Sequence, residues 1–321
     1  MSSSHWPRPN PTASELLPPV RDEATPVVDD PRAIRSAVAY AGRTAVLATK
    51  HGKLGQIAPA MRGVLGIEVV GVGVDTDQLG TFSGEIPRTL SELDCAIAKA
   101  RLAMRECGSD LGMASEGTFS PHPDVPWLTT DRELVVLVDD QLDHVFWECA
   151  VSVEVTAITE MVDSEADLTS LALRADLPRH AVIVRPAVPS PRSGHGAEQI
   201  YKGIRRPSDL SSAVEASCAA SGTRHAMVTT DFRAHCCPSR QIVIADAAER
   251  LAHRVASRCR ECGAAGWGTV DSVRGVPCHW CGRHVPIVRA EIDGCWNCGV
   301  RIERSVGEAA ADPGMCDRCN P

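Results

Sequence analysis

Hydrophobic and polar residues follow two different periods along this 321-residue chain, and the periods predict different elements. Short continuous apolar runs are typical of buried strands, whereas apolar residues at every third or fourth position are typical of helices. The expected strands are residues 44–48, 67–74, 110–115, 133–139, 144–155, 180–185 and 225–230. The expected helices are residues 31–43, a segment around 57–65, and residues 91–104, 165–176, 207–221 and 239–258. Their alternation predicts an α/β domain with a mixed, largely parallel sheet and flanking helices.

The helix expected after Ser91 carries two charged residues beside its apolar face. Asp94 follows Ser91 at the spacing of a capping box, which favours a helix start at this point. Glu92 and Lys99 are almost two turns apart, so they lie on one side of the helix with the small Ala96 between them. The pair indicates either a ligand site or a solvated surface ion pair, and the spacing fits both.

Charged residues stand at or next to the ends of five predicted strands. These residues are Lys50, Asp75, Glu116, Arg185 and Asp231. In open α/β sheets, ligands bind just outside the carboxyl ends of the strands. Cations and carboxylates at that edge suit a phosphorylated ligand together with Mg²⁺, which prefers oxygen ligands. The alternative is that strands simply end in polar residues because loops are polar.

Lysine is scarce in this chain. Of the 33 basic residues, only Lys50, Lys53, Lys99 and Lys202 are lysines. Lysine binds phosphate as a compact point charge, so a lysine that remains in an arginine-rich chain is a candidate phosphate ligand. We interpret Lys50, Lys53, Lys99 and Arg233 as candidate phosphate-binding residues, although chance also explains the survival of any one lysine.

The last part of the chain contains four C-x-x-C pairs. The pairs are Cys259/Cys262, Cys278/Cys281, Cys295/Cys298 and Cys316/Cys319, with spacers of 15, 13 and 17 residues. Two such pairs make a tetrahedral Cys₄ zinc site. The spacers predict that the first pair joins the second and the third joins the fourth, which gives a double zinc-ribbon module with two structural Zn²⁺ ions. Disulfides and free thiols are the alternatives.

Composition divides the chain into three parts. Residues 1–30 are rich in Pro, Ser and acidic residues and are expected to form a disordered tail. Residues 31–257 form the expected α/β domain, and residues 258–321 form the expected zinc module. The chain has 44% hydrophobic residues, which is enough for a core.

The charge and the hydrophobic pattern exclude some classes of partner. A net charge of −8 argues against a protein that binds nucleic acid by bulk electrostatics. No run of 18 apolar residues predicts a membrane span, and the first residues do not have the pattern of a signal peptide. Paired and single cysteines together fit the reducing cytoplasm, where we expect the protein to reside.

Five motifs give the chain a resemblance to a known family. The motifs are ATKHGK (48–53), DTDQLGTFSGEIPR (75–88), ASEGTFSPHP (114–123), TDFRAHCCPSR (230–240) and CDRCNP (316–321). Over residues 44–321 the chain resembles a family of uncharacterised bacterial proteins that carry a domain of unknown function. The resemblance implies an α/β body with a C-terminal zinc module and no particular activity. The family has Asn where this chain has Cys237, which argues against a site role for that residue.

Residues 44–118 also resemble the inosine-triphosphate pyrophosphatase superfamily, whose members use Mg²⁺ to cut non-standard nucleoside triphosphates to monophosphate and pyrophosphate. The likeness consists of Thr49, of Glu92 with Ala96 and Lys99, and of Glu116 with Gly117. It implies that Lys99 contacts phosphate and that Glu92 and Glu116 hold Mg²⁺ or activate water. The first loop departs from the superfamily, because His51 replaces an Asn and Lys53 comes one residue early.

Two functions of different classes follow. The first is a Mg²⁺-dependent phosphohydrolase in which Glu92, Lys99, Glu116 and Asp231 are the catalytic residues. The second is a protein without enzymatic activity, whose body senses a ligand and whose zinc ribbons dock a protein or nucleic acid. Nucleophilic catalysis by Cys236 or Cys237 near His235 is a minor third option, because neighbouring residues rarely point at each other.

Overall fold

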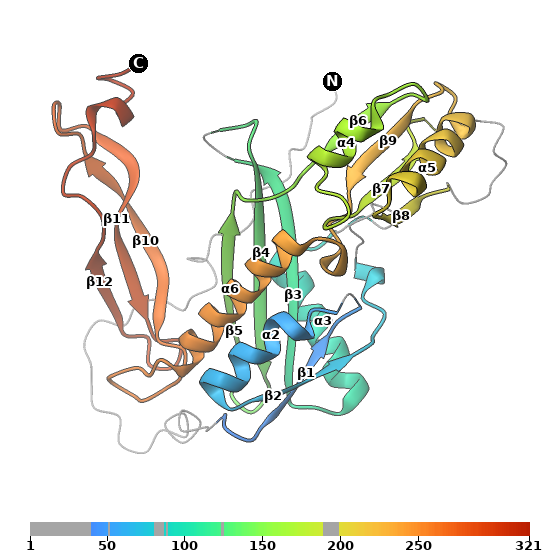
Figure 1. Ribbon diagram of the computed structural model, residues 1–321. Helices are drawn as coiled ribbons and strands as arrows, with labels where there is room; N and C mark the ends of the chain where they lie inside the picture. Colours follow the sequence, from blue (N-terminus) through green and yellow to red (C-terminus); the bar gives the residue numbers. More distant parts are fainter. Residues whose placement is uncertain (1–39, 51, 80–86, 88, 123–124, 189–198) are drawn as a thin grey trace, which may run out of the picture. The chain divides into compact units, whose positions relative to one another are not determined.

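The computed structural model describes residues 40–50, 52–79, 87, 89–122, 125–188 and 199–321 (Figure 1). The chain divides into two units, which we call the body, Ala41–Ala252, and the C-terminal unit, His253–Pro321. The tail expected over residues 1–30 lies outside the described residues, as does most of the helix expected over residues 31–43. Residues 40–43 of that segment form a turn instead.

A five-stranded sheet in the order β2-β1-β3-β4-β5 forms the first half of the body. Its strands are β1 (Thr44–Ala48), β2 (Glu68–Val72), β3 (Leu111–Pro121), β4 (Thr129–Asp139) and β5 (His144–Ser152). The strands β1, β2 and β3 are parallel, whereas β3, β4 and β5 form an antiparallel meander. Helix α2 (Leu54–Ala60), which a π-helical turn (Met61–Leu65) extends, connects β1 to β2, and α3 (Glu92–Cys107) precedes β3.

Helix α3 covers one face of this sheet, as its apolar pattern predicts. Ala96, Ala100 and Met104 pack in one buried cluster with strand residues that include Val46 and Val136. The side chain of Ser91 accepts a hydrogen bond from the backbone N–H of Asp94 at 3.1 Å, so the expected N-terminal cap is confirmed. Small alanines on this face let the helix lie close to the sheet, which leaves little room for side chains between them.

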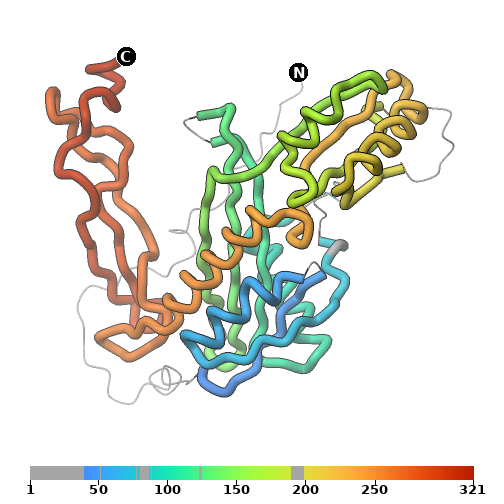
Figure 2. Tube along the Cα trace, in the orientation of Figure 1, coloured from blue at the N-terminus to red at the C-terminus, as the bar shows by residue number. Residues whose placement is uncertain are grey.

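A second, antiparallel sheet in the order β6-β9-β7-β8 forms the rest of the body. Its strands are β6 (Thr159–Val162), β7 (Val182–Pro186), β8 (Tyr201–Ile204) and β9 (Ala226–Thr230). Helices α4 (Leu168–Arg174) and α5 (Pro207–Ala220) pack side by side on it, as the tube in Figure 2 also shows. The 3₁₀ turn Ala234–Cys236 and helix α6 (Pro238–Ala256) follow β9.

The predicted α/β structure with a mixed sheet and flanking helices is confirmed, but the expectation that the sheet is largely parallel is wrong. Among the described residues, parallel pairing is confined to β1 with β2 and β1 with β3. A parallel connection needs about a dozen residues or more, and the β3–β4 and β4–β5 connections are shorter than that. Because β7 and β9 are antiparallel, Arg185 and Asp231 lie toward opposite ends of the second sheet.

Glu116 does not end a strand, because β3 continues to Pro121. The strand was expected to stop at Ser115, where the apolar run ends. Strand β4 pairs with β3 along its whole length, from Leu111 opposite Asp139 to Pro121 opposite Thr129. This pairing extends β3 beyond the limit of its hydrophobic pattern.

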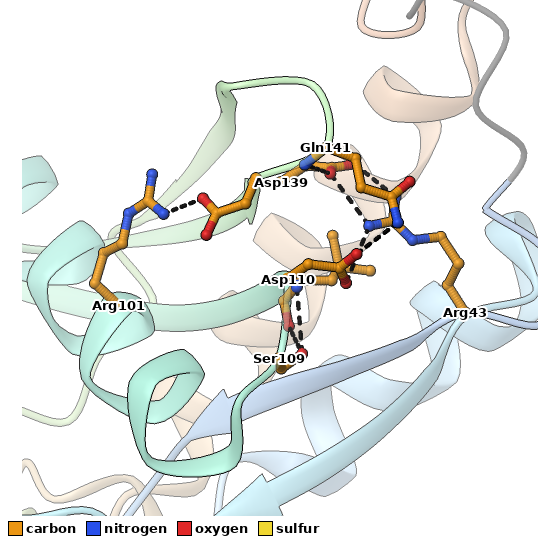
Figure 3. A network of polar contacts seen from close by, with 8 residues as sticks. Arg43, Arg101, Ser109, Asp110, Asp139 and Gln141 are labelled. Carbon is orange, nitrogen blue, oxygen red and sulfur yellow. Dashed lines mark hydrogen bonds and ion pairs between the residues drawn. The ribbon is translucent and has the colours of Figure 1, made fainter.

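Polar side chains join three segments at the end of the first sheet where β1 and β3 begin and β4 ends (Figure 3). Arg43, just before β1, donates to both carboxylate oxygens of Asp139 at 2.7 and 3.1 Å and lies 3.4 Å from Asp110. Gln141 donates to Asp110 at 2.5 Å, and its backbone N–H donates to Asp139. Asp139 is fully buried, so these donors replace the water that its carboxylate loses.

The C-terminal unit contains an antiparallel sheet in the order β10-β11-β12. Its strands are β10 (Gly268–Pro277), β11 (His284–Gly294) and β12 (Arg301–Ser305), and a 3₁₀ turn (Pro313–Met315) follows them. A further 3₁₀ turn in the body spans Asp77–Leu79. No helix in the described part of the chain is long and apolar enough to cross a membrane.

Candidate functional site

The eight cysteines of the C-x-x-C pairs gather into two groups of four in the C-terminal unit. Cluster 1 contains Cys259, Cys262, Cys295 and Cys298, and cluster 2 contains Cys278, Cys281, Cys316 and Cys319. In each cluster the four sulfur atoms lie within 4.8 Å of one another. The first pair thus joins the third and the second joins the fourth, so the expected pairing of neighbours is wrong.

The strands between the pairs explain this arrangement. Strand β10 separates the first pair from the second and has 10 residues, which span about 33 Å at the usual rise of a strand. Consecutive pairs are therefore carried to opposite ends of the sheet. In the antiparallel register, Gly268 lies opposite Gly294 and Pro277 opposite His284, which brings the third pair back beside the first. Strand β12 then returns the chain toward the second pair.

The distances between sulfur atoms fit a tetrahedral metal ion. Cysteine Sγ atoms lie 3.7 Å apart for Cys259–Cys298 and 3.6 Å apart for Cys262–Cys295 in cluster 1. In cluster 2 they lie 3.9 Å apart for Cys278–Cys319 and 3.7 Å apart for Cys281–Cys316. Zinc with four sulfurs at about 2.3 Å gives an edge of about 3.8 Å between sulfurs. A disulfide would need about 2.05 Å, so these are free thiols in an arrangement that could hold zinc.

Backbone geometry holds the sulfurs in place. Gly263, Gly282 and Gly299 each follow a C-x-x-C pair and have φ angles of 74°, 70° and 77°, a left-handed conformation that glycine adopts easily. Each donates its backbone N–H to the carbonyl of the first cysteine of its pair, at 2.9 to 3.0 Å. Asn297 also donates to the sulfur of Cys262 at 3.6 Å, a contact that stabilises a thiolate.

In the body, the structure brings together two of the four residues predicted as catalytic. Lys99 of α3 forms an ion pair with Glu116 of β3, and their side chains are 14% and 5% exposed. Cys95 also donates to Glu116 at 3.5 Å. Burial opposes ionisation of Glu116, but the charges of Lys99 and Lys53 outweigh it and lower the pKa of this carboxyl. Glu116 is therefore ionised in the folded protein.

Glu92 lies in the first turn of α3 and pairs with Arg132 of β4. Its second carboxylate oxygen, Oε1, is buried and has no hydrogen-bond partner among the described residues. Lys50 pairs with Asp75 at 2.7 Å, so the ends of the parallel strands β1 and β2 do meet.

Asp231 and Arg233 interact with each other and with the second sheet. Arg233 donates to Asp231 at 2.6 Å, and the backbone N–H of Gly203 donates to the same carboxylate at 3.0 Å. Burial opposes ionisation of Asp231, but the hydrogen bond and charge of Arg233 lower its pKa. Asp231 and Arg233 thus hold the loop after β9. Among the described residues, the hydrogen bonds of their side chains join them to each other, Gly203 and Cys236 rather than to Glu92, Lys99 or Glu116.

Lys53 donates to the Oγ and the carbonyl oxygen of Ser115 at 2.8 and 3.1 Å. Burial and the nearby charge of Arg240 lower the pKa of Lys53 to about 8. In β3, Ser115 and Glu116 point to opposite faces of the sheet because successive side chains alternate. Lys53 and Lys99 therefore approach β3 from different faces.

The most deeply buried ion pair was not predicted from the sequence. Arg240, in the first turn of α6, donates to Glu133 of β4, and both side chains are 0% exposed. Arg240 also donates to the carbonyl of Phe232 at 2.5 Å, and Phe232 stacks on Phe119 at 3.7 Å. A Cβ on Gly117 would lie 2.3 Å from the carboxylate of Glu133, so this strand position must be glycine. The sequence signal for this buried pair was the glutamate at the start of the apolar run of β4. Its position opposite Gly117 is known only from the register of the strands.

Asp131 lies two residues before Glu133 on the same face of β4. It is fully buried, and neither carboxylate oxygen accepts a hydrogen bond from the described residues. Burial and the negative charge of Glu133 raise the pKa of Asp131 to about 8. Asp131 is therefore mostly protonated at neutral pH, beside a glutamate that is already paired with Arg240.

Substitution Asp131→Asn is expected to change how the stability of the body depends on pH. Between about pH 4 and 8 the folded state keeps the proton of Asp131 and the unfolded chain does not, so stability falls as pH rises. Asn cannot ionise. The free energy of unfolding of the variant should therefore increase relative to that of wild type as pH rises, by up to about 1.4 kcal/mol per pH unit.

Urea unfolding at pH 5 to 8 measures this difference in free energy, and Glu154→Gln, at an exposed carboxylate, is the control. Parallel pH profiles for wild type and Asp131→Asn would contradict the raised pKa of Asp131.

Comparison with known proteins gives a family and no activity. No curated protein matches the chain significantly. A family model described as "Domain of unknown function (DUF6671)" matches residues 99–321. The match begins within α3, includes both cysteine clusters and covers well over half of the chain. The chain therefore belongs to this family, whose function is unknown.

Proposed function

We propose that this is a zinc protein in which each cysteine cluster holds one Zn²⁺ ion, so that two ions fix the C-terminal unit as a cross-linked zinc-ribbon module. The observation that carries the proposal is the spacing of the sulfur atoms, 3.6 to 3.9 Å, which matches the edge of a ZnS₄ tetrahedron. Four thiolate ligands leave no open position for water, so both ions are structural rather than catalytic.

Metal analysis of protein purified without chelator tests this proposal. Two Zn²⁺ per chain are expected, one for each cluster. A chelator should remove the metal and unfold the C-terminal unit, because binding free energy is folding free energy in small zinc modules. A metal content well below two, or a C-terminal unit that stays folded after the metal is removed, would contradict it.

A second candidate function, independent of the zinc, is Mg²⁺-dependent hydrolysis of a nucleoside triphosphate by the body. The specific observation in its favour is the buried, unpartnered oxygen of Glu92 on the helix that also carries Lys99. In this proposal Glu92 and Glu116 bind Mg²⁺, and Lys99 turns from Glu116 to the phosphate. A metal and a lysine together neutralise the charge that develops as water attacks phosphorus.

Pyrophosphate release from standard and deaminated nucleoside triphosphates with Mg²⁺ tests this candidate. Lys99→Met and Glu92→Gln are each expected to lower kcat/KM about 10²–10³-fold, the loss that follows removal of one charge-stabilising group. Because Lys99 neutralises a buried carboxylate, its variant also needs a melting curve to show that it is folded. Lys202→Met is the matched control and should keep full activity. No turnover by wild type would exclude this candidate.

Absence of turnover would favour the binding function, in which the zinc module docks a protein or nucleic acid. Trp280, between two cysteines of cluster 2, is 75% exposed, and Met315 near the same cluster is also exposed. Large exposed apolar side chains held on a rigid scaffold are typical of binding surfaces.

A further inference from the structure

His180 connects a serine and an aspartate in the body. Its Nδ1 lies 2.8 Å from a carboxylate oxygen of Asp176, and its Nε2 lies 3.1 Å from Oγ of Ser239. The ring is almost completely buried, whereas Ser239 and Asp176 are both half-buried, with the side chain of Asp176 43% exposed. A serine hydroxyl, an imidazole and a carboxylate in this order form the arrangement that activates serine as a nucleophile.

Hydrogen bonding determines which nitrogen of His180 carries the proton. The backbone N–H of Ser239 donates to Nε2 at 3.4 Å, so Nε2 is an acceptor. The ring proton therefore resides on Nδ1, where it is donated to Asp176. With this tautomer, the one lone pair of Nε2 lies within reach of both the N–H and the hydroxyl of Ser239. The hydroxyl is nearer, at 3.1 Å, as a general base requires.

The local fold brings these residues together from distant parts of the chain. Asp176 and His180 lie in the loop between α4 and β7, and Asp176 has a φ angle of 53°, an uncommon left-handed conformation for an aspartate. The backbone of Ala181 donates to Cys236 at 3.1 Å, which ties this loop to the segment before α6. Ser239 lies in the first turn of α6, where the helix dipole stabilises negative charge on its oxygen.

We propose that Ser239, His180 and Asp176 form a catalytic triad that hydrolyses carboxylic esters through an acyl-serine intermediate. Oγ of Ser239 attacks the carbonyl carbon while its proton passes to Nε2 of His180. The bond from carbon to the alcohol oxygen breaks, and the alcohol leaves with that proton. Water then attacks the acyl-serine and gives a proton to His180, which returns it to Ser239 as the carboxylic acid departs. This activity does not depend on the proposed zinc or phosphohydrolase functions.

Cys237, whose sulfur lies 3.4 Å from Oγ of Ser239, is not the nucleophile in this proposal. The cysteine is fully buried, and burial raises the pKa of its thiol, so little thiolate exists at neutral pH. A purely structural role for His180 is the competing explanation, because its Nε2 also caps the first turn of α6. The experiment must separate this cap from a nucleophile–base pair.

A fluorophosphonate probe tests the triad on the full, zinc-replete chain, because serine displaces fluoride from phosphorus only when a base activates its hydroxyl. Intact mass and peptide mapping should show one label, on Ser239, and none in Ser239→Ala. His180→Gln keeps an acceptor for the N–H of Ser239 but loses the base, so labelling and hydrolysis of p-nitrophenyl acetate should fall about 10²–10⁴-fold. Ser211→Ala, at an exposed serine of α5, should label as wild type does.

Asp176→Asn is the second variant, because the side chain of Asp176 is 43% exposed and Asn has nearly the same shape and also tolerates a positive φ, so the change should leave the fold intact. It replaces the carboxylate by a neutral amide, which removes the charge that stabilises the imidazolium and no longer fixes the Nδ1–H tautomer. It should therefore also slow labelling, while melting curves stay unchanged. The proposal is overturned if folded wild type takes no label, or if the label is on another residue. It is equally overturned if His180→Gln and Asp176→Asn, both folded, label as fast as wild type, because His180 would then be only a cap.

Discussion

Replacing Cys316 by Ser is expected to release the zinc ion of cluster 2 and to unfold the end of the C-terminal sheet that this ion holds. Among the described residues, the apolar side chains packed beside the cluster are few, namely Val276, Val285, Ile287 and Ala311. Burial of one such valine stabilises a protein by about 1.5–3 kcal/mol at most, whereas zinc binding contributes about 10–16 kcal/mol in small modules. The metal, not the apolar core, therefore dominates the stability of this unit.

The circular dichroism spectrum follows this unfolding, because the end of the antiparallel sheet loses its strand structure. Cys107→Ser is the matched control, since Cys107 is exposed and lies outside both clusters. The control should keep both ions and the wild-type spectrum. A Cys316→Ser protein that keeps two zinc ions per chain, or melts as wild type does, would contradict the account.

Substitution Arg240→Met is expected to destabilise the body by about 3–5 kcal/mol, because it leaves the carboxylate of Glu133 buried without a counter-charge. The carbonyl of Phe232 also loses its donor. Methionine fills much of the space of the arginine stem, so a cavity is not the main cause of the loss. Urea unfolding of the body measures the difference in free energy.

Two further variants separate the buried charge from other effects. Arg250 pairs with Asp246 on the surface of the same helix, and Arg250→Met should cost less than about 1 kcal/mol. The double variant Arg240→Met with Glu133→Leu removes both charges and should recover much of the lost stability. If Arg240→Met costs no more than Arg250→Met, the buried pair does not hold the body together.

Local patterns predicted the elements that depend on local interactions. The cap at Ser91 and the apolar stripe of α3 were both visible in the sequence, because residues three or four positions apart face the same way in a helix. The apolar run of β4 also predicted a buried strand. These features need no knowledge of distant partners.

Features that depend on distant partners were missed. Residue spacing between the cysteine pairs did not reveal that ten residues of β10 separate them in space, so the wrong pairs were joined. Glu116 was placed at a strand end because the apolar run stops there, but β4 extends the pairing. His180 and Ser239 are 59 positions apart, and no local pattern predicts that they meet.

The zinc content of two double-cysteine variants tests the central claim, that cluster 1 joins the first pair to the third and cluster 2 joins the second to the fourth. Cys259→Ser with Cys295→Ser removes two ligands from the same cluster and should leave one zinc ion per chain. Cys259→Ser with Cys278→Ser removes one ligand from each cluster and should lower the zinc content to near zero. If neighbouring pairs were joined instead, the results would be exchanged: the first variant would lose both ions and the second would keep one.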